Sequence, residues 1–193
     1  RVKHHAAVPY KQIGSFTKKL RKREGSSAFA LEFMILTAGR TGEVRGARWR
    51  EIDLSSQVWI IPADRMKAGK EHRVPLCNRA LEILNSIRSN RNPGEVVFPG
   101  WKPATGLSDG AMLALMRKID FGPYTPHGCL STFRDWAAEE AHEFSNETIE
   151  LALAHSIKNK AEAAYRRGDQ LERRRALMAA WSDMITHNLH TEE

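Results

Sequence analysis

The sequence has few of the features that mark secreted, membrane-spanning or zinc-dependent proteins. Its two cysteines, Cys77 and Cys129, have neither metal-site spacing nor the number that a disulfide framework needs. No apolar run approaches the roughly 20 residues of a membrane span, and no secretory signal opens the chain. His142-Glu143 lacks the second histidine of a His-Glu-x-x-His zinc hydrolase. These absences favour a reducing cytoplasm and argue against membrane contact and structural zinc.

The chain does contain enough apolar sequence for one domain and an excess of positive charge. Its 193 residues are 41% hydrophobic and 27% charged, as in an ordinary folded protein. The first residue is Arg1 rather than an initiator methionine, so we expect a piece of a longer polypeptide. A net charge of +7 and a pI near 9.6 favour a polyanionic partner such as nucleic acid. The alternative at this point is a protein that is basic without such a partner.

Hydrophobic periodicity predicts a mainly helical α+β domain with a small antiparallel sheet or hairpin. β-branched and aromatic residues favour a strand at 58–61. Residues 73–76 look like its partner strand, with a turn at 68–70 between them, and 96–98 is a possible short strand. Ser108 is a candidate helix cap. The predicted helices cover residues 11–23, 28–38, 41–48, 78–90, 108–118, 127–142, 145–154 and 170–185.

Arg40 lies at the start of a predicted helix, in the segment TAGRTGE at 37–43. Free N–H groups and the helix dipole favour an anion at such a position, and a guanidinium can bind two phosphate oxygens. The structural alternative is an ion pair between Arg40 and Glu43 on a solvated helix face.

Lys67 lies just before the predicted turn, with Lys70 as an alternative because turn positions are uncertain by a residue or two. A lysine there can donate a proton to a leaving alkoxide, whereas most turn lysines are simply solvated. His127 opens a helix and His155 closes an apolar one. A helix N-terminus lowers a histidine's pKa, which suits a base; a cap and a half-buried core residue are the structural alternatives.

Tyr165 is followed by Arg166 and Arg167. A tyrosine hydroxyl with a pKa of ~10 is a poor nucleophile unless neighbouring cations favour loss of its proton. Alone, this pattern is also that of an amphipathic helix edge.

Taken in order, these segments resemble the catalytic domain of the tyrosine recombinases, or phage integrases, and most closely the prophage integrases of the satellite-phage type. The resemblance covers nearly the whole chain. It rests on residues 37–43, 46–49, 73–76, 131–136 and 159–181.

The resemblance implies that residues 1–193 form an integrase catalytic domain whose N-terminal arm- and core-binding domains lie outside this fragment. Its partners would be double-stranded DNA attachment sites and other protomers, as a tetramer on DNA, in a bacterial cytoplasm associated with the nucleoid. No metal or other cofactor is expected. Tyr165 would attack the scissile phosphate to give a 3′-phosphotyrosyl bond. Arg40 would bind the nonbridging oxygens, and Lys67 would protonate the leaving 5′ oxygen.

Supporting roles follow from the same resemblance. His127 and His155 would hydrogen-bond the phosphate or accept the tyrosine proton, and Glu43 would support the site from behind. The residues expected to contact DNA are Arg134, Arg166, Arg167 and Lys70.

One position departs from the family's pattern. The second catalytic arginine should lie three residues after His127, where this chain has Leu130. Arg134 is one helical turn further on, but the pattern has an arginine there too, so we interpret it as a structural or DNA-backbone residue rather than a replacement. Removing such a donor lowers the rate ~10²–10³-fold. The alternative function is therefore a catalytically impaired DNA-binding remnant. A type IB topoisomerase, similar in fold and chemistry, is disfavoured because residues 159–181 look integrase-like.

Overall fold

The computed structural model describes residues 6–88, 92, 94–102, 105–155 and 168–187. Helices dominate, and the strands form a three-stranded antiparallel sheet in the order β1-β2-β3. The predicted α+β class is therefore confirmed. The helices are α1 (Ile13–Arg21), α2 (Ser26–Thr37), α3 (Thr41–Arg45), α4 (Asn78–Ile87), α5 (Ala111–Lys118), α6 (Gly128–Glu139), α7 (Asn146–Ala152) and α9 (Leu171–His187), and the strands are β1 (Ile52–Asp53), β2 (Val58–Ile61) and β3 (His72–Pro75).

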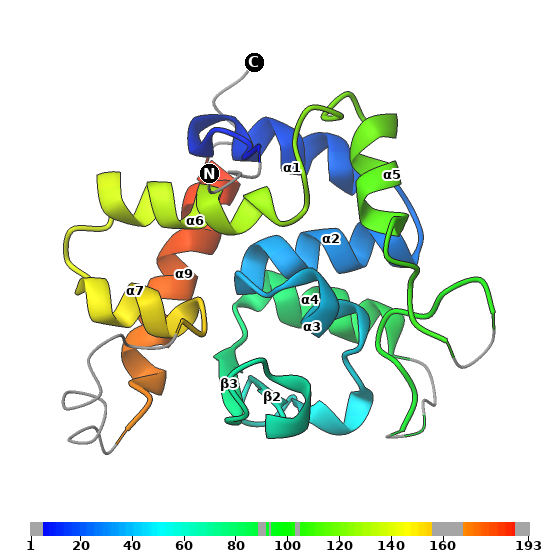
Figure 1. Cartoon of the computed structure of the whole chain (residues 1–193). Helices are drawn as coiled ribbons and strands as arrows, with labels where there is room; N and C mark the ends of the chain where they lie inside the picture. The colour runs from blue at the N-terminus through cyan, green and yellow to red at the C-terminus, as the bar shows by residue number, and fades with distance from the viewer. Residues whose placement is uncertain (1–5, 89–91, 93, 103–104, 156–167, 188–193) are drawn as a thin grey trace.

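The core is built around α2, which contacts α1, α4, α5, α6 and α9 (Figure 1). Its sequence is almost continuously apolar, and nine of its twelve residues are buried. A helix that is apolar on all sides belongs inside a protein. The helix ends where Ala38 takes a left-handed conformation (φ 47°), a common helix-terminating geometry. This end of α2 delivers Arg40 to the start of α3.

The last helix, α9, packs on its own domain. Leu177, Met178, Trp181 and Ile185 are buried along one stripe, and the Trp181 indole N–H donates to the Ile35 carbonyl of α2 at 2.8 Å. In Figure 1, α9 runs from the level of α7 to the level of α1.

The three-stranded sheet contacts α3 through the connection between β2 and β3. β2 pairs with β3 through Trp59 and Val74 and with β1 through Trp59 and Ile52. The connection from β2 to β3 is longer than the predicted turn, because a 3-10 helix at Ala63–Arg65 precedes it. The Arg65 guanidinium holds this helix by donating to the Glu51 carboxylate and the Glu43 carbonyl.

Three local predictions need correction. Val96 makes a single bridge to Arg48 rather than a strand at 96–98. Ser108 is not the cap of α5; Gly110 occupies that position, and the Ala111 N–H donates to the Ser108 carbonyl in the preceding turn. The third helix ends at Arg45, before the predicted position 48. In each case a local backbone hydrogen bond or bridge defined the boundary, and side-chain periodicity does not encode it.

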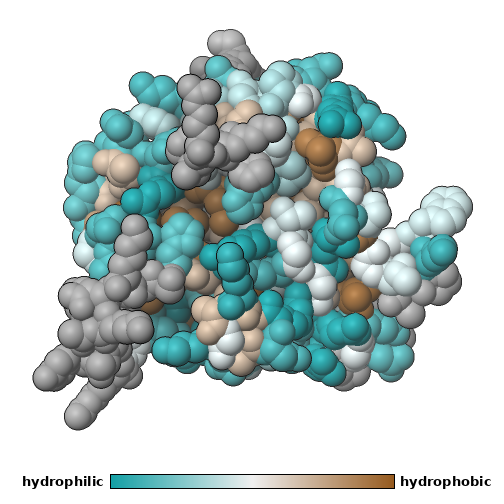
Figure 2. Space-filling view, viewed as in Figure 1, coloured by the Kyte–Doolittle hydropathy of each residue, from teal (hydrophilic) through white to brown (hydrophobic). Residues whose placement is uncertain are grey.

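Within the described residues, no helix has the length and apolar character that crossing a membrane requires. On the face shown in Figure 2, hydrophilic residues predominate and apolar residues form small separate areas.

Candidate DNA-cleavage site

Arg40 is held by Glu43 at the beginning of α3. The Arg40 backbone N–H donates to Glu43 Oε2 at 2.9 Å, and its Nη1 donates to Glu43 Oε1 at 2.8 Å. The Glu43 side chain is 9% exposed, against 27% for Arg40. The predicted structural alternative, an ion pair, therefore exists. It is not a solvated surface pair, because the buried carboxylate fixes the direction of the guanidinium.

The same guanidinium contacts the end of α7. Arg40 Nη2 donates to the carbonyls of Leu153 at 3.1 Å and Ala154 at 3.3 Å. A helix C-terminus carries unpaired carbonyls and partial negative charge, which favour a cation. Ala154 has a left-handed conformation (φ 51°), and the next N–H, of His155, bonds back to the Glu150 carbonyl at 3.0 Å. This turn places His155 beside Arg40.

His155 is oriented by Glu150, since its Nδ1 lies 2.8 Å from Glu150 Oε2. Burial lowers the pKa of His155, and the positive charges of Arg40 and Arg134 lower this pKa further. A neutral ring whose Nδ1–H donates to a carboxylate presents an unprotonated Nε2. His155 is therefore suited to accept a proton or a hydrogen bond at Nε2.

Arg134, on α6, joins this group through an ion pair between its Nη1 and Glu150 Oε1. The Glu150 carboxylate thus contacts Arg134 with one oxygen and His155 with the other. Leu130, one turn earlier on α6, is 7% exposed and belongs to the apolar core. The expected second arginine position therefore carries no charge and is closed off by packing.

A second ionic cluster joins α9 to β3. The Arg73 guanidinium donates to both oxygens of Asp169, at 2.7 and 2.8 Å. Arg174, which is 1% exposed, donates to Asp169 Oδ2 at 2.8 Å and to the Arg73 carbonyl. Burial, with the charge of Arg174, lowers the pKa of neighbouring His72 to about 4. Glu43 and Arg40 also act on that pKa, so His72 lies close to the first cluster.

The structure describes some of the other predicted site residues but not all of them. Lys67 lies in a turn closed by the Gly69 N–H to the Met66 carbonyl at 2.9 Å, and Lys67 and Lys70 are exposed. His127 is the exposed N-cap residue of α6. The approach of Lys67 and His127 to Arg40 stays a prediction. Tyr165, Arg166 and Arg167 lie outside the described residues.

Sequence reasoning missed Glu150, His72, Asp169 and Arg174. Glu150 had a usable signal, because its position five residues before His155 lets it meet the histidine across a helix C-terminal turn. Arg174 shares the helical stripe of Leu177 and Trp181. Asp169 gave no such signal, because its two partners come from separate elements.

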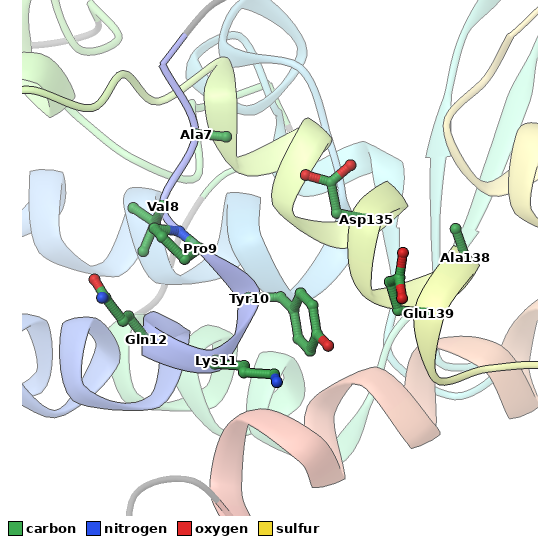
Figure 3. A pocket seen from close by; sticks show the side chains of 9 residues that line it. All are labelled: Ala7, Val8, Pro9, Tyr10, Lys11, Gln12, Asp135, Ala138 and Glu139. Atoms are coloured by element: carbon green, nitrogen blue, oxygen red, sulfur yellow. The ribbon is translucent and has the colours of Figure 1, made fainter.

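A separate open pocket of about 700 Å³ lies between the N-terminal segment and α6. Figure 3 shows the Tyr10 ring beside the helix, with Asp135 and Glu139 projecting from α6. The Tyr10 hydroxyl donates to Glu140 at 2.9 Å. Carboxylates repel phosphate, so this pocket does not suit the DNA backbone. Among the described residues, no three His, Cys, Asp or Glu side chains are placed to hold a metal ion.

Comparison with known proteins identifies the family. The sequence pattern of the phage integrase family matches residues 8–171. The chain belongs to the phage integrase family. The predicted resemblance to tyrosine recombinases is thereby confirmed.

Among similar integrases, prophage integrase IntA of Escherichia coli K12 is 37% identical over 155 residues, which cover 79% of this chain and 37% of IntA. Prophage integrase IntZ of the same organism is 36% identical, covering 94% of this chain and 45% of IntZ. The integrase of Enterobacteria phage P4 is 30% identical, covering 97% and 47%. The chain therefore spans less than half the length of each of these integrases.

A solved structure, the integrase from mycobacterium phage Brujita, has the same fold. Its TM-score is 0.66 at 14% sequence identity, over 98% of this chain and 64% of that integrase. At this identity the match shows that the two proteins share a fold, and no more.

Proposed function

We propose that the chain is the catalytic domain of a tyrosine recombinase that cleaves and rejoins double-stranded DNA at attachment sites, together with other protomers, in a bacterial cytoplasm. The observation that carries this proposal is the placement of Arg40. Its guanidinium is fixed by buried Glu43 and by the end of α7, beside a histidine whose pKa is lowered. A preorganised cation next to a neutral base is what attack on a phosphodiester requires.

In the proposed reaction, the Tyr165 hydroxyl oxygen forms a bond to phosphorus as the bond from phosphorus to the 5′ oxygen breaks. His155 Nε2 accepts the tyrosine proton, and the protonated ring can then donate a hydrogen bond from Nε2 to the phosphate. Lys67 gives a proton to the 5′ oxygen, and Arg40 and His127 contact the nonbridging oxygens. Arg166, Arg167 and Lys70 contact the DNA backbone. The 3′-phosphotyrosyl bond keeps the phosphoester energy, so rejoining is the reverse of these transfers and needs no cofactor.

Covalent trapping on a nicked duplex tests the proposal, because loss of a short 5′ fragment prevents rejoining. A denaturing gel should show a protein–DNA adduct that Tyr165→Phe abolishes. Arg40→Ala should reduce its rate about 10²–10³-fold, as for loss of a preorganised charge donor. Arg88→Ala, at the exposed end of α4, is the matched control and should leave the rate unchanged. An adduct that persists in Tyr165→Phe would contradict the assigned nucleophile.

A second function is favoured by the burial of Leu130 in the core. If no cation takes the place of the second arginine, the domain holds DNA without cleaving it at a useful rate. Tight binding of the nicked duplex without an adduct would support this alternative.

A further inference from the structure

We infer that Arg134 supplies the second phosphate-binding guanidinium in this chain, positioned by Glu150, in place of the arginine that Leu130 has replaced. The inference rests on the proposed cleavage function. It also changes the interpretation of Arg134 drawn from its sequence pattern alone, because the structure shows what its guanidinium contacts.

The Arg134 guanidinium is able to reach an anion outside the core. Leu130 and Arg134 are four residues apart on α6, so their side chains project from the same side of the helix. The Leu130 side chain is packed into the core, whereas the Arg134 side chain is 47% exposed. Its ion pair with Glu150 uses Nη1, and a guanidinium has five N–H donors. Arg134 can therefore keep this pair and still present donors to an anion.

Arg134 is held by a carboxylate in the same way as Arg40. Each guanidinium is held by one glutamate of low exposure, Arg40 by Glu43 (9% exposed) and Arg134 by Glu150 (25% exposed). Arg40 donates to the carbonyl of Ala154, the residue before His155, and Arg134 shares the Glu150 carboxylate with the His155 ring, so both guanidiniums lie near this imidazole. Glu150 orients that imidazole with its other oxygen. Two carboxylate-held guanidiniums thus converge on one histidine, an arrangement that suits the two nonbridging oxygens of a phosphate.

A purely structural role for Arg134 predicts a different result. If Arg134 serves only to hold α6 against α7, its loss should lower the cleavage rate no more than loss of Glu150, which also orients His155. If Arg134 contacts the phosphate, its loss should lower the cleavage rate far more than loss of the Glu150 carboxylate does. Glu150→Gln removes the carboxylate but still leaves a guanidinium in the site.

The experiment measures the rate of adduct formation at saturating nicked duplex. Arg134→Ala should lower this rate about 100-fold, with an affinity change of less than about threefold because many other cations contact the backbone. Glu150→Gln should lower it no more than about tenfold. Methylguanidinium at millimolar concentration should restore part of the Arg134→Ala rate. Arg175→Ala is the control: Arg175 pairs with Glu172 at 3.3 Å on α9 and should change the rate less than about twofold.

If Arg134→Ala does not fold, Arg134→Lys provides the test. It keeps a positive charge beside Glu150 but lacks the planar fork of a guanidinium, so it should cleave about tenfold more slowly than the parent. Equal losses in Arg134→Ala and Glu150→Gln without rescue would overturn the inference while leaving the proposed function intact. A parent protein that binds the nicked duplex but forms no adduct would overturn the proposed function, and would show as well that Arg134 does not replace the missing arginine.

Discussion

At the scale of single residues, His72 is the clearest case of a group that the sequence did not single out. It opens β3, and its surroundings hold it neutral: burial is the main cause of its pKa of about 4. The charged groups around it are Arg174, Arg40, Glu43 and Asp169, of which the arginines lower the pKa and the carboxylates raise it. The balance favours a neutral imidazole throughout the physiological range.

The low pKa of His72 predicts a pH-dependent stability. The unfolded chain, with an ordinary histidine pKa near 6.5, binds a proton that the folded chain rejects, so stability falls as pH drops from about 6.5 toward 4. Between pH 7 and pH 5 this group should cost the folded state about 2 kcal/mol. Urea unfolding should show that the cost disappears in His72→Gln. His142→Gln, at an exposed position, should keep the parent's pH dependence, and identical profiles for parent and His72→Gln would contradict the prediction.

The contact between Arg40 and Glu43 was predictable from the sequence, as the structural alternative, because the two residues are three positions apart at the start of one helix. Their roles in cleavage stay predictions. Sequence reasoning did not find the contacts of Arg134 and Asp169, since those depend on how α6 meets α7 and how α9 meets β3. A helical pattern gives the side on which a side chain lies but not the element that faces it.

At the scale of elements, α9 shows what a helical pattern can predict and what it cannot. An apolar stripe is typical of a helix that packs on its own domain, and Leu177, Met178 and Trp181 are buried along it. The stripe also contains Arg174, which is buried and paired with Asp169. Three successive arginines at 173–175 look alike in the sequence. Only the period of the helix distinguishes the buried middle one from its neighbours.

Trp181 should therefore be a main contributor to the docking of α9. Its ring lies 5.0 Å from that of Trp136 and 5.5 Å from that of Phe133, and its N–H is bonded inside the core. Trp181→Ala should lower the free energy of unfolding by about 3–5 kcal/mol, because it leaves a large cavity in the core. Arg173→Ala, exposed on the same helix, should change it by less than about 0.5 kcal/mol. Urea midpoints at constant slope would measure both, and equal effects would show that α9 is not held by this stripe.

At the scale of the whole molecule, the cations beside the sheet lie far from those that follow α1. Figure 1 shows α1 and the sheet at opposite ends, with α2 and α4 between them. The turn with Lys67 and Lys70 extends from the sheet, whereas Lys22 follows α1. Net charge alone left two alternatives, a polyanionic partner and a basic protein without one. The fold predicts, in addition, which cations face the DNA.

DNA binding should therefore depend steeply on salt and on cations at the sheet end. Each phosphate contact releases counterions, so affinity for a duplex should fall at least about tenfold between 50 and 200 mM salt. Lys70→Gln should weaken binding similarly for different sequences and lower the slope of log affinity against log salt by about one. Lys22→Gln removes the same charge from the far end and should leave the slope unchanged. Fluorescence anisotropy at several salt concentrations measures these slopes. Equal effects of the two variants would mean that the net charge of the domain, rather than a face formed at the sheet end, attracts the DNA.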